Sequence, residues 1–119
     1  MLASKYTVKE TIDRLVISLQ LRGMTIYARI DRQIESKWHG FESRLLEYIL
    51  IDDPRLSGPM IERYPRLALC FPVRMMAWED DGCWVAYKDP RISMRDHLPC
   101  DEDFYWPDLR PVIIGALSE

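Results

Sequence analysis

Hydrophobic residues recur at helical spacing near the start of the chain. The positions that share this spacing are Val8, Ile12, Leu15 and Leu19. Thr7 and Glu10 fit a capping box, in which the hydroxyl accepts from the N3 amide and the carboxylate reaches back to the N-cap amide. Gly23 suits a left-handed helix end because it has no Cβ. The pattern predicts an amphipathic helix over residues 8–22.

The spacing then changes to a period of two. Ile26, Ala28 and Ile30 alternate with Tyr27 and Arg29. This alternation predicts a strand over 25–31 with one buried face. Residues 32–43 are mostly polar and indicate a connection with a short helical turn. Residues 45–51 leave two readings open, because their leucines suit a helix face whereas their β-branched and aromatic second half suits a buried strand.

A β-hairpin is predicted over residues 71–87. Asp81-Gly82 is typical of a two-residue type I′ turn, which makes Trp78 face Val85. One hairpin face then carries Arg74, Met76, Trp78, Val85 and Tyr87, and the other carries Val73, Met75, Ala77, Trp84 and Ala86. Because both faces are largely apolar, we expect helices to cover one of them and further packing or a partner chain to cover the other.

Three shorter segments complete the predicted elements. Residues 57–59 resemble a helix start with proline near N1, and Pro65 limits that helix to about two turns. A short helix is predicted over 90–97, followed by an acidic loop over 98–103. Residues 108–117 carry hydrophobic positions near helical spacing and predict a closing helix.

Composition indicates one ordinary globular domain. The chain has 119 residues, of which 48% are hydrophobic, and a formal net charge of −3, which suits a single core. No run approaches the ~18 uncharged apolar residues of a membrane span, and the start lacks the long apolar core of a secretory signal. Three cysteines without a C-x-x-C pair argue against a disulfide framework and predict a cytoplasmic location.

Charge is unevenly distributed along the chain. Residues 1–59 hold nine basic and eight acidic residues, whereas residues 60–119 hold seven and eleven. No segment collects the clustered Lys/Arg that phosphate binding needs, and the acidic second half repels a phosphate backbone. We therefore expect no nucleic-acid partner.

Metal-binding and thiol chemistry find little support in the sequence. His97 and Cys100 are three residues apart, but a proline between them opposes a continuous helix, and no second pair completes four ligands. Cys83 lies beside acidic residues, which raise a thiol pKa, and Cys70 suits core packing. We expect no metal, no cofactor and no catalytic cysteine.

Acid–base and phosphate-binding motifs are equally weak. The aspartate pairs at 52/53, 80/81 and 101/103 fall in predicted turns, where aspartate bonds the backbone and stays solvated. The sequence contains no Gly-rich phosphate loop, no G-x-S-x-G and no H-E-x-x-H. These observations predict no catalytic residue.

Arg74 is a lone cation between apolar neighbours in the predicted hairpin. Two readings remain open. In the first, which we favour, a carboxylate of Asp89 or Glu79 pairs with Arg74 in a buried or rim salt bridge. In the second, Arg74 binds an anion in a pocket lined by Tyr87 and Trp78. Tyr87 itself suits a core aromatic with a hydrogen-bonded hydroxyl.

The hairpin and its flanks carry a recognisable set of residues. Phe71–Asp80 runs into Trp-Glu-Asp, and Trp84–Tyr87 and Asp89-Pro90 follow. This pattern resembles domain-of-unknown-function family number 302, and residues 4–11 and 23–31 look like its first helix and strand. The resemblance implies a small α+β fold with helices packed on an antiparallel sheet, and it favours a strand over 46–51. It implies no established activity.

The chain departs from the family pattern at several positions. Lys88 stands where the family usually has Asn, Asp53 replaces an Asn before proline, and Ser57-Gly58 replaces Gly-Thr. The tail over 99–106 is also unusual for the family.

Together these features predict an α+β fold, with an antiparallel sheet of about four to five strands and two or three helices packed mainly on one face. We expect residues 1–119 to form a single domain, with an atypical tail from about residue 99. The predicted function is a non-enzymatic binding or interaction module, a homodimer that forms through a sheet face. The alternative is a small enzyme or small-anion-binding protein with a pocket around Arg74, Tyr87, Asp89 and His97. The candidate ligand-binding residues are Arg74, Trp78, Tyr87, Asp89 and His97.

Overall fold

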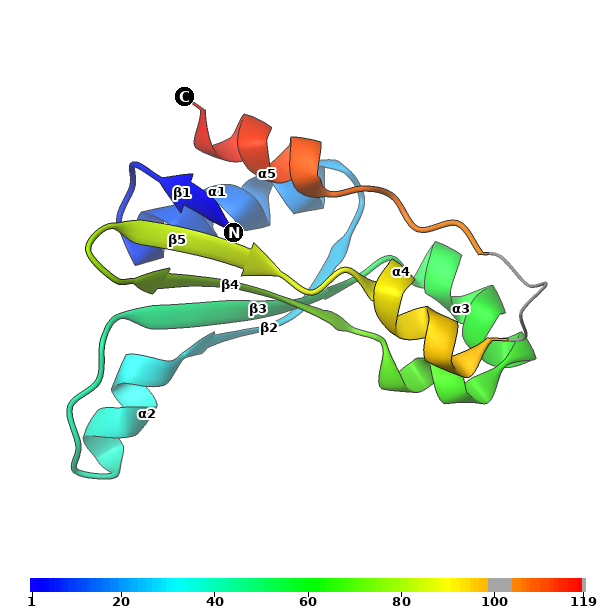
Figure 1. Cartoon of the computed structure of the whole chain (residues 1–119), viewed down its shortest axis with the longest axis horizontal. Helices are drawn as coiled ribbons and strands as arrows, with labels where there is room; N and C mark the ends of the chain where they lie inside the picture. Colours follow the sequence, from blue (N-terminus) through cyan, green and yellow to red (C-terminus); the bar gives the residue numbers. More distant parts are fainter. Residues whose placement is uncertain (99–103, 119) are drawn as a thin grey trace.

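An antiparallel five-stranded sheet forms the centre of the protein (Figure 1). The computed structural model describes residues 1–98 and 104–118. The strands are β1 (Leu2–Ser4), β2 (Thr25–Asp31), β3 (Leu46–Asp52), β4 (Val73–Glu79) and β5 (Cys83–Tyr87). Their order across the sheet is β1-β5-β4-β3-β2, and every neighbouring pair is antiparallel.

Helices connect the strands and close the chain. The α-helices are α1 (Val8–Leu21), α2 (Arg32–Trp38), α3 (Pro54–Arg63), α4 (Pro90–Ser93) and α5 (Arg110–Leu117), and the 3-10 helices are η1 (Pro65–Leu69) and η2 (Met94–His97). Figure 1 shows α5 beside α1, and α3 and α4 together at the far end of the sheet from α2. The predicted α+β class is confirmed, with more helical segments than the two or three expected.

Helix α1 covers the core face of the sheet. Its capping box at Thr7 and Glu10 forms as predicted, and Gly23 adopts a φ of 81° just beyond the helix. The fully buried side chains of this layer include Ile12, Leu15 and Leu19 from α1, and Ile49 and Met75 from the sheet. Burial of such residues contributes roughly 1.5–3 kcal/mol each, so the helical spacing of the first segment secures the helix to the sheet.

The ambiguous segment at 45–51 is strand β3, as the family resemblance favoured. It pairs with β2 on one side and β4 on the other. Inward residues such as Ile49 and Ile51 are fully buried, and the alternate positions Tyr48 and Leu50 are half-buried. A central strand with apolar residues on both faces resembles a helix in sequence, which explains the ambiguity.

The hairpin β4–β5 forms, but its predicted register is wrong by one residue. Glu79 pairs with Cys83, and Trp78 faces Trp84 instead of Val85. The loop therefore has three residues, 80–82, with positive φ at Asp81 and Gly82. Because side chains alternate between faces, this slip moves Val85 to the core face and Trp84 to the opposite face.

Helix α3 begins earlier than predicted. Asp53 caps it, with Oδ1 accepting from the amide of Arg55 at 3.1 Å, and Pro54 occupies N1. Pro59, predicted near a helix start, lies inside the helix instead. An aspartate cap followed by proline satisfies the first helical turn, so Asp53-Pro54 is a stronger start signal than Ser57-Gly58-Pro59.

The aspartate pair at 52/53 is buried instead of solvated, which corrects the expectation for it. Asp52 is 6% exposed and Asp53 is 7% exposed, because β3 leads directly into α3. Ser57 Oγ donates to Asp52 Oδ2 at 2.7 Å, whereas Asp52 Oδ1 has no hydrogen-bond partner among the described residues. Asp80 and Asp81 are exposed, as expected, and the pair at 101/103 lies outside the described residues.

The second face of the sheet consists of three rows of side chains across β3, β4 and β5. From the hairpin turn outward, the rows are Leu46, Trp78 and Trp84; Tyr48, Met76 and Ala86; and Leu50, Arg74 and Lys88. The residues of the first two rows are half-buried. This second face is therefore apolar near the hairpin turn and cationic at the far end.

Candidate functional site

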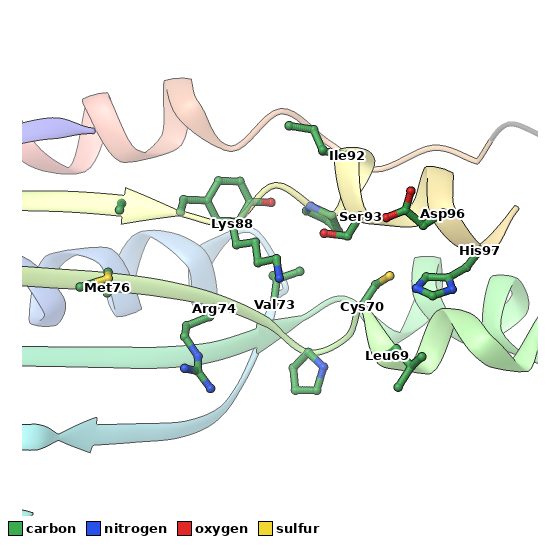
Figure 2. Close-up of a pocket in the computed structure, with 14 residues that line it drawn as sticks. Leu69, Cys70, Val73, Arg74, Met76, Lys88, Ile92, Ser93, Asp96 and His97 are labelled. Carbon is green, nitrogen blue, oxygen red and sulfur yellow. The ribbon is translucent and has the colours of Figure 1, made fainter.

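A groove opens at the cationic end of this face, between the sheet and the short helical segments η1, α4 and η2 (Figure 2). Its volume is about 810 Å³, within the range of roughly 300–1,000 Å³ typical of small-molecule sites. The polar side chains that line it are Cys70, Arg74, Tyr87, Lys88, Ser93, Asp96 and His97. Apolar contacts come from Leu69, Pro72, Met76 and Ile92.

Arg74 and Lys88 are neighbours across the β4–β5 ladder. The backbone amide of Lys88 donates to the carbonyl of Arg74 at 3.1 Å, and both side chains line the groove. The Arg74 guanidinium stacks over the ring of Tyr48, with Cζ 4.5 Å from the ring centroid. Two cations thus line the groove from neighbouring strands, with the Arg74 guanidinium directed toward β3 and the Lys88 side chain toward the helical segments (Figure 2).

The predicted salt bridge of Arg74 does not form. Arg74 is exposed, and no ion pair joins it to a carboxylate of residues 1–98 or 104–118. Asp89 instead pairs with the guanidinium of Arg91. Asp89 also caps α4 by accepting a hydrogen bond from the backbone amide of Arg91, and this cap keeps its carboxylate beside Arg91. Stacking on Tyr48 orients Arg74 without neutralising its charge.

The helical wall supplies the remaining polar groups. Segment 90–97 forms a short helix as predicted, and it brings Ser93, Asp96 and His97 to the groove. His97 Nδ1 is buried and has no hydrogen-bond partner in the described structure. Burial raises the pKa of the Cys70 thiol, with Lys88 opposing this and Asp96 adding to it, so the thiol is protonated at neutral pH.

Tyr87 lies between this groove and a second, smaller cavity of about 330 Å³. Trp106 Nε1 donates to the Tyr87 hydroxyl at 2.7 Å, which confirms the expected core aromatic with a bonded hydroxyl. Burial raises the pKa of Tyr87 far above its ordinary value. The second cavity contains the charged side chains Asp89, Arg91, Asp108 and Arg110.

The five sequence-predicted site residues do not all meet. Arg74, Tyr87 and His97 line the groove, whereas Asp89 lines the second cavity. Trp78 lies in the row nearest the hairpin turn, away from both. Sequence reasoning missed Lys88 and Asp96; the signal for Lys88 was its departure from the family's usual Asn.

Metal and nucleophile sites gain no support from the described residues. They contain no cluster of three or more His, Cys, Asp or Glu able to hold a metal ion. Cys83 is buried, and its Sγ lies 3.5 Å from Thr11 Oγ1. The His97–Cys100 pair of the sequence analysis includes Cys100, which lies outside the described residues.

Comparison with known proteins identifies the family. The model of the family "Domain of unknown function DUF302" matches residues 1–103. The chain belongs to the DUF302 family. The resemblance seen in the hairpin residues is thereby confirmed.

Curated proteins similar to this DUF302 chain are named as fluoride channels. Fluoride-specific ion channel FluC 1 from Brucella suis is 28% identical over 103 residues, which are 84% of this chain and 41% of the channel. FluC 1 from Brucella abortus and FluC 2 from Brucella melitensis are also 28% identical, over 38% of their lengths. The chain thus spans about two fifths of these relatives. No helix among its described residues is long and apolar enough to cross a membrane.

A solved DUF302 structure shares the fold. It is the crystal structure of an uncharacterized conserved DUF302 protein from Bacillus stearothermophilus, with a TM-score of 0.71. The match covers 98% of this chain and 93% of the other at 13% sequence identity. At that identity the likeness shows the fold alone.

Proposed function

We propose that this DUF302 chain is a non-enzymatic binding module that holds a small anionic molecule in the groove at Arg74 and Lys88. The supporting observation is that these two cations line one groove and that neither has a carboxylate partner among the described residues. A bound anion supplies the counter-charge that both side chains lack among the described residues. Arg74 supplies a planar donor fork that suits a carboxylate or phosphate.

The groove favours binding over catalysis. A nucleophile needs a neighbouring base within hydrogen-bond reach, and no hydrogen bond links Cys70 to His97 in the described structure. The raised pKa of Cys70 also keeps the thiolate scarce. The rival enzyme hypothesis requires turnover of a bound anion, which a product assay on the liganded protein would detect.

Fluoride is a second candidate because the curated relatives are named as fluoride-specific channels. The groove is far larger than a single fluoride ion, and apolar residues form part of its wall. These features favour an anion with an organic body over a bare halide. Fluoride is therefore a probe that the test must include.

The test is isothermal titration of the full chain with butyrate, phosphate and fluoride. We expect butyrate or phosphate to bind, and Arg74→Met or Lys88→Met to weaken that binding at least about tenfold, since charge-assisted hydrogen bonds contribute roughly 1.5–3 kcal/mol. Arg22→Met and Lys37→Met are matched controls, because both side chains are exposed and away from the groove. Equal affinity in the groove variants and the controls contradicts the proposal. If fluoride binds and neither butyrate nor phosphate does, the second candidate, fluoride, is supported instead.

We also propose that the chain forms a homodimer through the apolar part of the second sheet face. Trp78, Trp84 and Met76 are half-buried there, and Trp38 and Phe41, in α2 and the loop after it, are 79% and 56% exposed. Apolar surface of this extent commonly marks an interaction site. A second copy is the proposed occupant, because a two-fold contact matches this face with itself.

Light scattering after gel filtration tests the dimer. The wild-type chain is expected at twice its monomer mass, and Trp78→Lys is expected to run as a folded monomer. Ile17→Lys, at a 59% exposed position on α1, is the control and stays dimeric. A monomeric wild type at high concentration excludes the homodimer.

A cytoplasmic location completes the proposal. Cys70 and Cys83 are free thiols, which suits a reducing compartment. Fractionation of cells that produce the full-length natural protein tests this location. Recovery of the protein outside the cytoplasmic fraction would contradict it.

A further inference from the structure

The two walls of the groove differ in charge. The sheet wall carries Arg74 and Lys88, and the helical wall carries Ser93 and Asp96 (Figure 2). Cations therefore border one side of the cavity and a carboxylate and a hydroxyl border the other. A ligand that spans the groove meets opposite charges at its two ends.

None of these four side chains has a hydrogen bond or ion pair within the described structure. Nearby charged residues behave differently, because Asp89 and Arg91 pair closely with each other outside the groove. His97 Nδ1 adds a buried polar atom without a partner at the same wall. Charged and polar side chains that line one cavity and do not pair with each other are the arrangement expected of a binding site.

We propose that the ligand is a small zwitterion of the short-peptide class, a proposal that rests on the anion-binding function above. Arg74 and Lys88 hold its carboxylate, and Asp96 and Ser93 hold its ammonium group. The volume of about 810 Å³ exceeds what a single free amino acid fills. Leu69, Pro72 and Ile92 contact the apolar side chains of the peptide between its charged ends.

The experiment compares three probes that differ only at their ends: the dipeptide Ala-Leu, its N-acetyl form and its C-terminal amide. Isothermal titration of the full chain is expected to show Ala-Leu binding about tenfold more tightly than either blocked form, because each block removes one charge-assisted contact. Asp96→Asn is expected to lower the affinity for Ala-Leu to that of the N-acetyl form. The same variant leaves binding of N-acetyl-Ala-Leu unchanged.

The controls separate this inference from the anion-binding function. Asp96 is exposed and makes no side-chain bond in the described structure, so Asp96→Asn keeps the fold. Glu62→Gln, at an exposed position outside the groove, keeps the preference for Ala-Leu. If N-acetyl-Ala-Leu binds wild type as tightly as Ala-Leu, the ammonium contact is wrong while the anion site stands. If butyrate or phosphate binds and no dipeptide does, the peptide class is wrong, and if no anion binds either, the proposed function fails as well.

Discussion

Trp106 donates its indole N–H to the phenolic oxygen of Tyr87 at 2.7 Å, and this bond joins the segment before α5 to the last residue of β5. Trp106 is only 2% exposed, so water cannot replace the acceptor. Its ring also packs against Phe71, with centroids 5.1 Å apart. The bond therefore fixes Tyr87, which lines both cavities, against the C-terminal part of the chain.

Removing this acceptor should destabilise the protein. Tyr87→Phe leaves the buried indole N–H unsatisfied, and we expect the free energy of unfolding to fall by about 1–3 kcal/mol. Urea denaturation followed by circular dichroism measures the change. Tyr105→Phe is the control, because Tyr105 is 70% exposed and adjacent in sequence. Equal losses in the two variants, or no loss in either, would count against a structural role for the bond.

The buried Asp52 predicts an unusual dependence of stability on pH. Burial raises its pKa, and the hydrogen bond from Ser57 only partly opposes this. A raised folded-state pKa means that Asp52 contributes most below its unfolded pKa, and that this contribution is lost as pH rises through the folded value. The difference in unfolding free energy, Asp52→Asn minus wild type, should therefore increase from pH 3 to pH 7. Denaturant titrations at several pH values measure it.

The neighbouring Asp53 has a lowered pKa, so the pH dependence of its contribution to stability is opposite to that of Asp52. Its hydrogen bond from the Arg55 guanidinium holds its pKa below the ordinary value, so its contribution is present above the unfolded pKa and is lost as pH falls through the folded one. Asn also caps helices well, so Asp53→Asn isolates the charge. We expect a loss of about 0.5–1 kcal/mol at pH 7 from the helix N-terminus, and no loss at a pH below the folded pKa. The same slope in both aspartate variants would contradict these assignments.

The hairpin loop predicts a sharp requirement for glycine. Gly82 has a φ of +119°, and a Cβ there would meet Trp84 Nε1 at an ordinary 3.9 Å. The penalty for Gly82→Ala is therefore backbone strain, and we expect about 1–2 kcal/mol of destabilisation by thermal or urea unfolding. Gly115→Ala, in α5 with open space around it, should be neutral or stabilising. Similar effects at the two glycines would argue against the three-residue loop.

The adjacency of Arg74 and Lys88 has a measurable effect without any ligand. Lys88→Gln removes one of two like charges that neighbour each other across the ladder, and it should raise the free energy of unfolding by about 0.5 kcal/mol at low ionic strength. The gain should shrink at high salt, because ions screen the repulsion. Lys37→Gln, on the exposed side of α2, should show no such salt dependence. A loss of stability in Lys88→Gln would mean that Lys88 has a favourable partner.

Local sequence signals predicted much of the fold. The capping box at Thr7 and Glu10 satisfies amides within one turn, so α1 could be predicted without knowledge of its neighbours. The alternation of apolar and polar residues over 25–31 also predicted β2, because it is a pattern within one short segment. Strand β1 was missed, because three residues at Leu2–Ser4 are too few to form a pattern and become a strand by pairing with β5.

The candidate site depended on facts that are not local. The segment Asp80-Asp81-Gly82 suits either a two- or a three-residue loop, because both place residues at positive φ, and only the pairing of the whole sheet decided which side chains share a face. That register places Lys88 opposite Arg74 on the second face, and it pairs Tyr87 with Met75 of the core face. The sequence favoured a salt bridge between Arg74 and Asp89 or Glu79. In the structure Asp89 caps α4 and pairs with Arg91, so it does not pair with Arg74.

The sequence by itself determined the α+β class, the helix over the core face and the hairpin, because each depends on periodicity or on contacts within a few residues. The tertiary structure alone decided that Lys88 lies beside Arg74 and that Ser93 and Asp96 face them across a groove. Those relationships join β4, β5 and a helical segment that are brought together by packing. Packing is cooperative over the whole core, so no single stretch of the chain encodes it.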